Sequence, residues 1–412
     1  MSLMDKLSDP ESWQGFYDYR TSLACPKEYE QELKSFLEKR AYLPVCESIA
    51  RGDRFPLPRR AVISKLHSQK KRIVYIYPSD ENTVLKLLTY LLLRKYDGLY
   101  AEGLYSFRPG RSAKDAIRHL TRLSGIRRMY AYKVDISNYF NSIPVERLLP
   151  MLREAVGEDA ALYSFLEKLL TEEEVLDQGS AIREQKGIMA GTPLASFYAN
   201  LYLKDLDQAF ADKGIPYARY SDDIIVFADS REETALHAET IRRFLKESGL
   251  AVNPDKEQFF TPEEGWTFLG FSYREGVIDI APATVAKLKQ KMRRKTRALM
   301  RWSRRNGVEG TKAAAAFIRI FTRKLLENAG DNELTWSCWF FSVINTCESL
   351  KQIDAYARDS IRYLVSGTRT KARFNLRYED IKALGYRNLV HAYYEYKERE
   401  KEAENAENYG TE

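Results

Sequence analysis

Two adjacent carboxylates, Asp222 and Asp223, are the most informative pair of residues in this chain of 412 residues. Strand-forming segments at 215–219 and 224–228 flank a Ser-Asp-Asp cluster, which predicts a hairpin with the acids at its turn. Acids on exposed turns are common, so the pair alone indicates no function. A further acid in the same neighbourhood is needed.

Asp135 is such an acid, because it ends the strand-like run 130–134. An acid at the end of a buried strand and an acid pair on a neighbouring hairpin can converge on two divalent cations. Such ions lie ~3.5–4 Å apart and clamp the attacking and leaving oxygens of a phosphoryl transfer. The order Asp135, then Asp222 and Asp223, is the one that the palm of a nucleic-acid polymerase requires.

Seven short sequence blocks follow one another along the chain. They are 71–73, 105–112, 135–140, 187–193 with 199–203, 220–223, 249–256 and 266–271. The series resembles the successive blocks of bacterial reverse transcriptases, the group that includes group II intron, diversity-generating retroelement, retron and phage-defence enzymes. Each block alone is a weak signal, but seven in the right order are not expected by chance.

The resemblance implies an α+β, right-hand polymerase fold with fingers, an antiparallel palm sheet backed by helices, and an α-helical thumb. The expected ranges are 1–130 for the fingers with an N-terminal helical extension, 131–275 for the palm with a helical insertion at about 144–174, 276–366 for the thumb, and 367–412 for a C-terminal segment with a charged tail.

Residue patterns within these ranges predict individual elements. Helices are expected at 28–40 and 82–96, and a hairpin at 62–77. A separate C-terminal segment is expected at 378–396. The charged residues after Lys397 are predicted to be frayed.

The resemblance makes Asp135, Asp222 and Asp223 the catalytic acids. Magnesium prefers about six oxygen ligands at ~2.0–2.1 Å, so the backbone carbonyl of Ile136 is expected to complete the metal shell beside these acids. Two Mg²⁺ ions are expected, with Mn²⁺ as a substitute. Asp223 either contacts the metals directly or supplies charge from behind them, and the alternative is an ordinary turn acid.

Phe140 lies where reverse transcriptases place an aromatic gate under the incoming sugar. A ring there would collide with a 2′-hydroxyl and select deoxyribonucleotides. The alternative is a core phenylalanine. Tyr139 is predicted to be the buried member of the two.

Four basic residues resemble the family's substrate-binding and catalytic cations. Lys71, Arg72 and more distantly Arg108 match the cations that bind a triphosphate, although 71–72 could instead be a solvated hairpin edge. Lys256 matches a lysine placed near the leaving pyrophosphate as a proton donor. Its alternative is a surface lysine after a turn.

The block at 187–193 departs from the family. Many relatives have Pro-Gln-Gly where this chain has Met-Ala190-Gly191, so the glutamine amide expected to contact the nucleotide or template is missing. Gly191 still permits close backbone approach, and Ser196 and Asn200 remain as polar groups with capping or packing as alternatives. Residues 266–271 resemble a primer grip, but an apolar strand would have the same pattern.

Composition is that of a large soluble enzyme, with 44% hydrophobic and 30% charged residues. The four cysteines have no metal-ligand spacing and are expected to be reduced. No stretch approaches the ~20 apolar residues of a membrane span, and no signal peptide is recognisable. We therefore expect a cytoplasmic protein with no membrane partner.

The segment 287–305 contains ten Lys or Arg residues and no acid. In a helix, Leu288, Met292, Leu299 and Trp302 would line one side and the cations the remainder, a shape suited to a phosphate backbone. A solvated basic helix is the alternative. The residues expected to contact the duplex are Lys287, Lys291, Arg294, Arg297 and Arg301.

The C-terminal stretch from 361 to 394 is similar to that of compact reverse transcriptases of the so-called unknown groups, many of them linked to phage defence. Less chain remains after Gly270 than maturase and endonuclease extensions need, and retron signatures are not evident. A diversity-generating retroelement enzyme stays open.

The predicted function is RNA-directed DNA synthesis from deoxyribonucleotides on a structured non-coding RNA, in anti-phage defence. That RNA could serve as template or scaffold, and an RNA/DNA duplex would be bound. A homo-oligomer or a companion defence protein is also considered. The alternatives are a template-independent or protein-primed polymerase of the same fold, and a non-catalytic RNA-binding relative.

Overall fold

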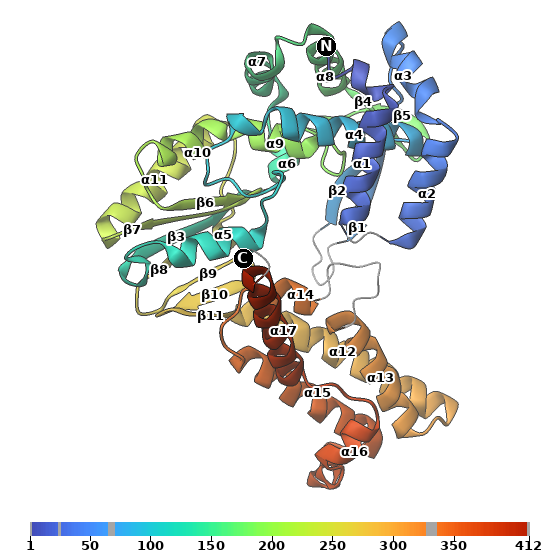
Figure 1. The fold of residues 1–412 in the computed structure, drawn as a ribbon, viewed down its shortest axis with the longest axis vertical. Helices are drawn as coiled ribbons and strands as arrows, with labels where there is room; N and C mark the ends of the chain where they lie inside the picture. The colour runs from blue at the N-terminus through green and yellow to red at the C-terminus, as the bar shows by residue number, and fades with distance from the viewer. Residues whose placement is uncertain (1, 24–25, 65–70, 327–335, 410–412) are drawn as a thin grey trace. The chain divides into compact units, whose positions relative to one another are not determined.

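The computed structural model describes residues 2–23, 26–64, 71–326 and 336–409. The chain divides into two compact units (Figure 1). The first comprises Met1–Leu23 and Lys27–Pro262, and the second comprises Ala24–Pro26 and Glu263–Glu412. Helices and strands occur in both units, so the predicted α+β class is confirmed.

An antiparallel sheet with the strand order β6-β7-β3-β8 lies in the first unit. Its strands are β3 (Tyr130–Asp135), β6 (Tyr217–Tyr220), β7 (Asp223–Ala228) and β8 (Gln258–Phe260). The hairpin predicted around the two acids is formed by β6 and β7. Helix α11 (Arg231–Glu247) packs against β3 and β7.

Both faces of β7 are buried, which explains its unbroken apolar run. Ile224 and Val226 join the main hydrophobic core, and Ile225 and Phe227, which point to the opposite face, are equally inaccessible. A strand covered on both sides cannot show the alternation of polar and apolar residues that a half-exposed strand shows.

A second sheet in the first unit has the strand order β2-β1-β4-β5. Its strands are β1 (Arg59–Ser64), β2 (Lys71–Ile76), β4 (Glu174–Asp177) and β5 (Ser180–Arg183). The expected hairpin at 62–77 corresponds to β1 and β2, and residues 65–70 lie outside the described part. The pair β4–β5 was not predicted, because β4 is short and joins β1 through a single parallel residue pair.

Two helices, α7 (Val145–Val156) and α8 (Ala160–Thr171), form the helical segment expected at about 144–174. Asp159 caps α8 by accepting a hydrogen bond from the Leu162 N–H. The same carboxylate accepts hydrogen bonds from the Ser2 hydroxyl and the Leu3 N–H, so it also ties the N-terminal segment to this helix pair.

The helices expected near 28–40 and 82–96 are α2 (Lys27–Glu38) and α4 (Ser79–Lys95). Leu85, Leu88 and Leu92 of α4 are fully buried in the main core. The other helices of this unit are η1 (Asp5–Leu7), α1 (Pro10–Ser22), α3 (Tyr42–Arg51), η2 (Asp97–Leu99), α5 (Ala113–Arg122), η3 (Ile126–Arg128), α6 (Tyr139–Ser142), α9 (Ala195–Tyr202), α10 (Lys204–Ala211) and η4 (Pro254–Lys256).

The second unit begins with a small antiparallel sheet, β11-β10-β9, and continues with helices. Its elements are β9 (Trp266–Phe268), β10 (Phe271–Arg274), β11 (Val277–Ile280), α12 (Pro282–Asn306), α13 (Gly310–Leu325), α14 (Trp336–Phe340), α15 (Glu348–Ser366), η5 (Lys371–Asn375), α16 (Tyr378–Ala383) and α17 (Leu389–Tyr409). The units divide at 262/263, whereas the palm is predicted to reach 275, and the four functional ranges stay predictions.

Two expectations about this unit are corrected. Trp302 does not line the buried side of α12, since it is 43% exposed, and Thr296 and Ser303 are buried instead. The buried residues of α12 recur at steps of three and four, and the residues after Thr296 that are buried are Leu299, Met300 and Ser303. The chain beyond Lys397 is not frayed along its whole length, because α17 extends to Tyr409.

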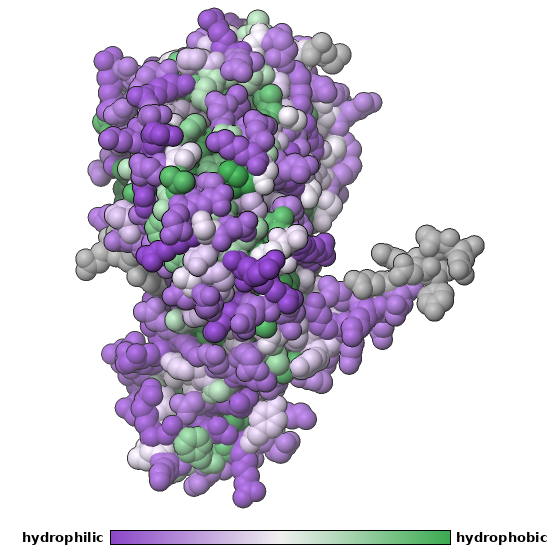
Figure 2. Space-filling model, turned by 90° about the vertical axis from the view of Figure 1, so that its left-hand side faces the viewer, coloured by the Kyte–Doolittle hydropathy of each residue, from purple (hydrophilic) through white to green (hydrophobic). Residues whose placement is uncertain are grey.

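The face of the molecule seen in Figure 2 is largely hydrophilic, with hydrophobic residues in small separate patches. Among the described residues, none of the helices combines the length and the apolar character needed to cross a membrane.

Candidate active site

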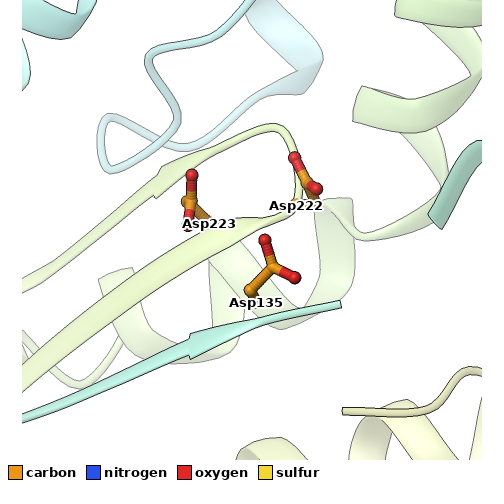
Figure 3. A group of neighbouring side chains, drawn as sticks. All are labelled: Asp135, Asp222 and Asp223. Carbon is orange, nitrogen blue, oxygen red and sulfur yellow. The ribbon is translucent and has the colours of Figure 1, made fainter. Parts of the chain in front are cut away.

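The three predicted acids converge at one end of the β3–β7 pair. Asp135 ends β3 and lies directly opposite Asp223, the first residue of β7. The N–H of Ile136 donates a hydrogen bond of 3.0 Å to the backbone carbonyl of Asp222. One oxygen from each carboxylate lies within 4.8 Å of the others. Figure 3 shows Asp135 on one strand and the two other acids on the hairpin beside it.

The hairpin turn is held by a polar network that reaches two distant segments. Ser221 has a positive φ of 59°, and its N–H donates to the Ser106 hydroxyl at 2.8 Å. That hydroxyl donates to the side-chain oxygen of Asn200, whose amide donates back to the Ser106 carbonyl. Asn200 therefore has a packing role that positions the turn, one of the alternatives left open by the sequence.

A buried ion pair lies beneath the same turn. Arg219 and Asp207 have fully buried side chains, and two nitrogens of the guanidinium bind the carboxylate at 2.5 and 2.7 Å. Arg219 also donates to the Ser221 carbonyl, and the Tyr217 hydroxyl donates to Asp207. Sequence reasoning assigned no role to this pair, although a charged residue in an otherwise apolar strand was a usable signal.

Burial and mutual repulsion perturb the acids on the hairpin. Burial, followed by the charge of Asp135, raises the pKa of Asp222 above its ordinary value. Burial and the charges of Asp222 and Asp135 raise the pKa of Asp223 to about 6. Carboxylates this close destabilise one another when all are ionised, so a cation among them is electrostatically favoured.

Lys256 and Asn253 both bind Asp135. The Lys256 ammonium donates to one carboxylate oxygen at 2.5 Å, and the Asn253 amide donates to the other at 3.0 Å. Burial lowers the pKa of Lys256, but the hydrogen bond to Asp135 raises it, and the net effect is an increase. The Asn253 contact was not predicted, even though this residue lies in one of the recognised blocks.

The loop that carries Lys256 is fastened to the strand end by backbone hydrogen bonds. The N–H of Asn253 donates to the Asp135 carbonyl, and the N–H of Ser137 donates to the Ala251 carbonyl, both at 2.8 Å. The Lys256 side chain is 54% exposed and its ammonium binds Asp135, so Lys256 is neither a buried residue nor an isolated surface lysine.

Phe140 and Tyr139 differ in burial as predicted. Tyr139 is buried, and its hydroxyl donates to the Ala199 carbonyl at 2.6 Å. Phe140 is partly exposed, and its ring meets the ring of Phe107 edge to face, with centroids 6.4 Å apart. Its assignment as the sugar gate stays a prediction.

The loop at 187–193 packs on the second sheet. The Ala190 N–H donates to the Asn141 side chain, and the Ala190 carbonyl accepts from the Tyr75 N–H. The Ala190 side chain is buried and so does not face solvent. Gly191 has a φ of 100°, and a Cβ there would lie 3.1 Å from Cβ of Val74. The close backbone approach that Gly191 permits is therefore to β2.

The basic residues predicted to bind the triphosphate fall into two groups. Lys71 and Arg72 begin β2 with exposed side chains, and the charge of Arg72 acts to lower the pKa of Asp222. Arg108 differs, because its side chain is only 5% exposed and donates hydrogen bonds to Asp97 at 2.7 Å and to the Ala101 carbonyl. These contacts give Arg108 a structural role in this structure, and its binding of a triphosphate stays a prediction.

The predicted duplex-binding residues all lie on α12 in the second unit. Lys287, Arg294, Arg297 and Arg301 are exposed, and Lys291 is partly buried. Burial, together with the neighbouring cations, lowers the pKa of Lys291. Their contact with a duplex stays a prediction.

The donor set suits a hard divalent cation. Asp135, Asp222 and Asp223 offer only oxygen ligands, which magnesium and manganese prefer. Their position at the end of an antiparallel sheet, with helices behind it, is that of the catalytic acids of a right-hand nucleic-acid polymerase.

Comparison with known proteins identifies the family of nucleic-acid polymerases to which this chain belongs. Residues 63–273, just over half of the chain, match the reverse transcriptase (RNA-dependent DNA polymerase) family. The chain therefore belongs to the reverse transcriptase family, as its sequence blocks predicted.

Curated relatives share part of this region. The chain is 28% identical over 151 residues to a 91 kDa protein in the cob intron of Schizosaccharomyces pombe, a match that covers 36% of this chain and 18% of that protein. It is 25% identical over 168 residues to the group II intron-encoded protein LtrA of Lactococcus lactis subsp. cremoris, covering 40% of this chain and 27% of LtrA. The matches thus span less than a third of either relative.

Similar solved structures include two telomerases in complex with a TWJ fragment of telomeric RNA. The Candida albicans structure is matched over 86% of this chain and 71% of that chain, with 12% identity and a TM-score of 0.44. The Candida tropicalis structure is matched over 80% and 64%, with 12% identity and a TM-score of 0.45.

Proposed function

We propose that this chain is an RNA-directed DNA polymerase that adds deoxyribonucleotides to a 3′-hydroxyl. Membership of the reverse transcriptase family supports the reaction class. The observation that carries the proposal is the convergence of Asp135, Asp222 and Asp223 within 4.8 Å of one another. Acids at this separation destabilise the metal-free protein, so a structural explanation for them is weak.

Two Mg²⁺ ions, for which Mn²⁺ can substitute, are the proposed cofactors. The three carboxylates and the backbone carbonyl of Ile136 would hold them. When bound, such ions stabilise the charge that develops on the attacking and leaving oxygens.

The surrounding side chains supply the remaining functions. Arg72, with Lys71, is proposed to bind the triphosphate, since its charge already acts on Asp222. Lys256 carries protons next to Asp135 and is proposed to donate one to the departing pyrophosphate. Phe140, partly exposed at the start of α6, is proposed to exclude ribonucleotides.

A structured non-coding RNA is the proposed template or scaffold, with the RNA/DNA duplex bound by the exposed cations of α12. A template-independent polymerase is the second candidate, and the alanine at position 190 favours it. Ala190 has no side-chain amide to contact a nucleotide or template as the glutamine of many relatives does.

The test is to incubate the purified protein with deoxyribonucleotides and Mg²⁺, with and without the RNA it carries, and to sequence the product. An RNA-directed enzyme makes DNA complementary to the RNA and makes none when the RNA is removed. Asp222→Asn should abolish synthesis while RNA binding stays nearly intact. Near-normal primer extension by that variant would refute the proposal.

Anti-phage defence in the bacterial cytoplasm is the proposed biological setting, and it is supported by the resemblance of the 361–394 stretch to compact defence-linked enzymes. Expression in a phage-sensitive bacterium should reduce plaque formation with the wild type and leave it unchanged with Asp222→Asn. Equal plaque numbers for both proteins over a broad phage panel would contradict this setting.

A further inference from the structure

A pocket of about 690 Å³ lies in the second unit, between α15, α16 and the start of α17. Pockets of ~300–1,000 Å³ are the usual size for small-ligand sites. Its charged lining has four cations and two acids: Lys351, Arg358, Lys382, Arg387, Asp354 and Glu395. Three tyrosines, Tyr378, Tyr386 and Tyr394, also line it.

One of the acids is used inside the fold. Asp354 is 1% exposed and accepts hydrogen bonds from the Tyr386 hydroxyl at 2.6 Å, the Leu389 N–H at 3.0 Å and the Val390 N–H at 3.1 Å. It therefore caps α17 from a neighbouring helix and fixes one wall of the pocket. Lys351 is paired with Glu348 and Glu395 lies 3.1 Å from His391, so the charge left for a ligand is mainly that of Arg358, Lys382 and Arg387.

Two of the rings are open to solvent. Tyr394 is 53% exposed and Tyr378 is 39% exposed. The guanidinium of Arg358 lies 6.0 Å from the ring centroid of Tyr378. Rings and guanidinium planes together form surfaces on which planar groups can stack.

Further contacts between guanidinium groups and aromatic rings occur in α15, in η5 and in the residues between them. Phe374, in η5, is 52% exposed, and the guanidinium groups of Arg362 and Arg373 lie 5.3 and 4.4 Å from its ring centroid. Arg369 lies 4.4 Å from the ring of Tyr363. Cations beside aromatic rings thus extend beyond the pocket, although Arg373 is also paired with Asp359 at 2.8 Å.

We propose that this pocket binds an unpaired segment of RNA. Cations with few uncommitted acids among them attract a phosphate backbone, and exposed rings stack on bases that are not paired. In a duplex the bases are stacked on one another and cannot reach such rings, whereas loops and bulges of structured RNA present them. A protein helix would instead need a continuous apolar groove. The inference rests on the proposed use of an RNA.

The test uses the full-length protein and a fluorescein-labelled oligoadenylate of about 12 nucleotides, within the ~4–16-nucleotide sites of single-strand binders. Binding is measured by fluorescence anisotropy in the presence of excess unlabelled RNA/DNA duplex, which occupies the duplex-binding surface. Stacking is worth ~1–3 kcal/mol per base, so Tyr378→Ala with Tyr394→Ala should weaken binding at least about tenfold.

The matched control is Tyr378→Phe with Tyr394→Phe, which keeps both rings and should bind within about twofold of the wild type. An oligonucleotide carrying 5-iodouridine should cross-link under ultraviolet light to peptides that contain Tyr378 or Tyr394. Wild-type affinity in the double alanine variant, or cross-links only outside the pocket, would overturn the proposal and point to a protein occupant.

Failure of the pocket proposal can be distinguished from failure of the proposed DNA synthesis. Asp222→Asn should bind the oligoadenylate as the wild type does, because the acid cluster lies in the first unit. Failure of the DNA-synthesis proposal would appear as retained synthesis in that variant. Failure of the pocket proposal would appear as retained binding in the double alanine variant.

Discussion

At the scale of single residues, the acid cluster lowers the stability of the metal-free protein and supplies ligands for cations. Asp222 and Asp223 both have raised pKa values, because burial and neighbouring acids disfavour their charged forms. Lys256 offsets part of this repulsion by binding Asp135 at 2.5 Å. In the metal-free protein the remaining repulsion between the carboxylates is destabilising, and removal of one charge should reduce it.

Asp223→Asn is expected to stabilise the metal-free protein at about pH 7 by roughly 1–3 kcal/mol. The folded-state pKa of about 6 lies above the ordinary value of 3.8, so between these values the folded protein binds more protons than the unfolded chain. The contribution of Asp223 to stability therefore falls as the pH rises from about 4 to about 6. Urea unfolding in the presence of a chelator measures the difference.

The same titration at about pH 3.5 is the control, since the carboxyl is then largely protonated in both states and the difference should shrink. A variant that is less stable than the wild type at about pH 7 would contradict the burial of a repelling charge. The variant should also bind Mn²⁺ more weakly, because one ligand is lost.

Phe140→Ala should admit ribonucleotides. Removal of the ring creates space for a 2′-hydroxyl, and the ratio of kcat/KM for deoxyribonucleotides over ribonucleotides should fall about tenfold or more. Single-nucleotide incorporation on a fixed primer-template measures the ratio. Phe259→Ala, at a phenylalanine that is 48% exposed on β8, is the matched control and should leave the ratio unchanged. Unchanged discrimination in Phe140→Ala would remove the gate assignment.

At the scale of elements, the β6–β7 hairpin is held by side chains that lie outside the acid cluster. The Arg219–Asp207 pair joins β6 to α10, and Ser106 and Asn200 fasten the turn to two other segments. A positive φ at Ser221 needs such support, because this backbone region is unfavourable for residues other than glycine.

Arg219→Met should destabilise the protein by ~3–5 kcal/mol, because it leaves Asp207 buried without its partner. Chemical denaturation followed by circular dichroism measures the change. Arg219→Met combined with Asp207→Leu removes both charges and should recover much of the stability. A loss of less than about 1 kcal/mol in the single variant would show that the pair is not a structural support of the hairpin.

At the scale of the whole molecule, each of the two units contributes its own chemistry. The first holds the acids, and the second exposes cations along α12 and the pocket of α15 to α17. Affinity for nucleic acid should therefore respond to charge in the second unit, and catalysis to charge in the first.

Arg297→Glu with Arg301→Glu should weaken binding of an RNA/DNA hybrid and reduce its salt dependence. Each lost phosphate contact lowers the slope of log K against log salt by about 0.9. Filter binding at several salt concentrations measures this slope. Lys246→Glu, at an exposed position of α11, is the control and should leave the slope unchanged. A slope equal to that of the wild type in the double variant would exclude these two arginines from the duplex contact.

The carboxylates, the hairpin and the basic helix could be predicted from the sequence because their signals are local. Asp222 and Asp223 lie between two strand-forming runs, and the cations of α12 lie within one helix. A residue's nearest neighbours along the chain suffice to predict such features. The position of Asp135 at the end of a strand-like run added the expectation that it would meet the hairpin, and the family blocks agreed with it.

Contacts between distant segments could be found only from the folded chain. Ser106 meets Ser221 across 115 residues and Asn200 across 94, and Arg108 is held by Asp97. The exposure of Trp302 and the pairing of β4 with β1 also depend on how the surrounding elements pack. Chain order does not encode these partners in any short pattern, because burial and hydrogen bonding are settled by the packing of the whole unit.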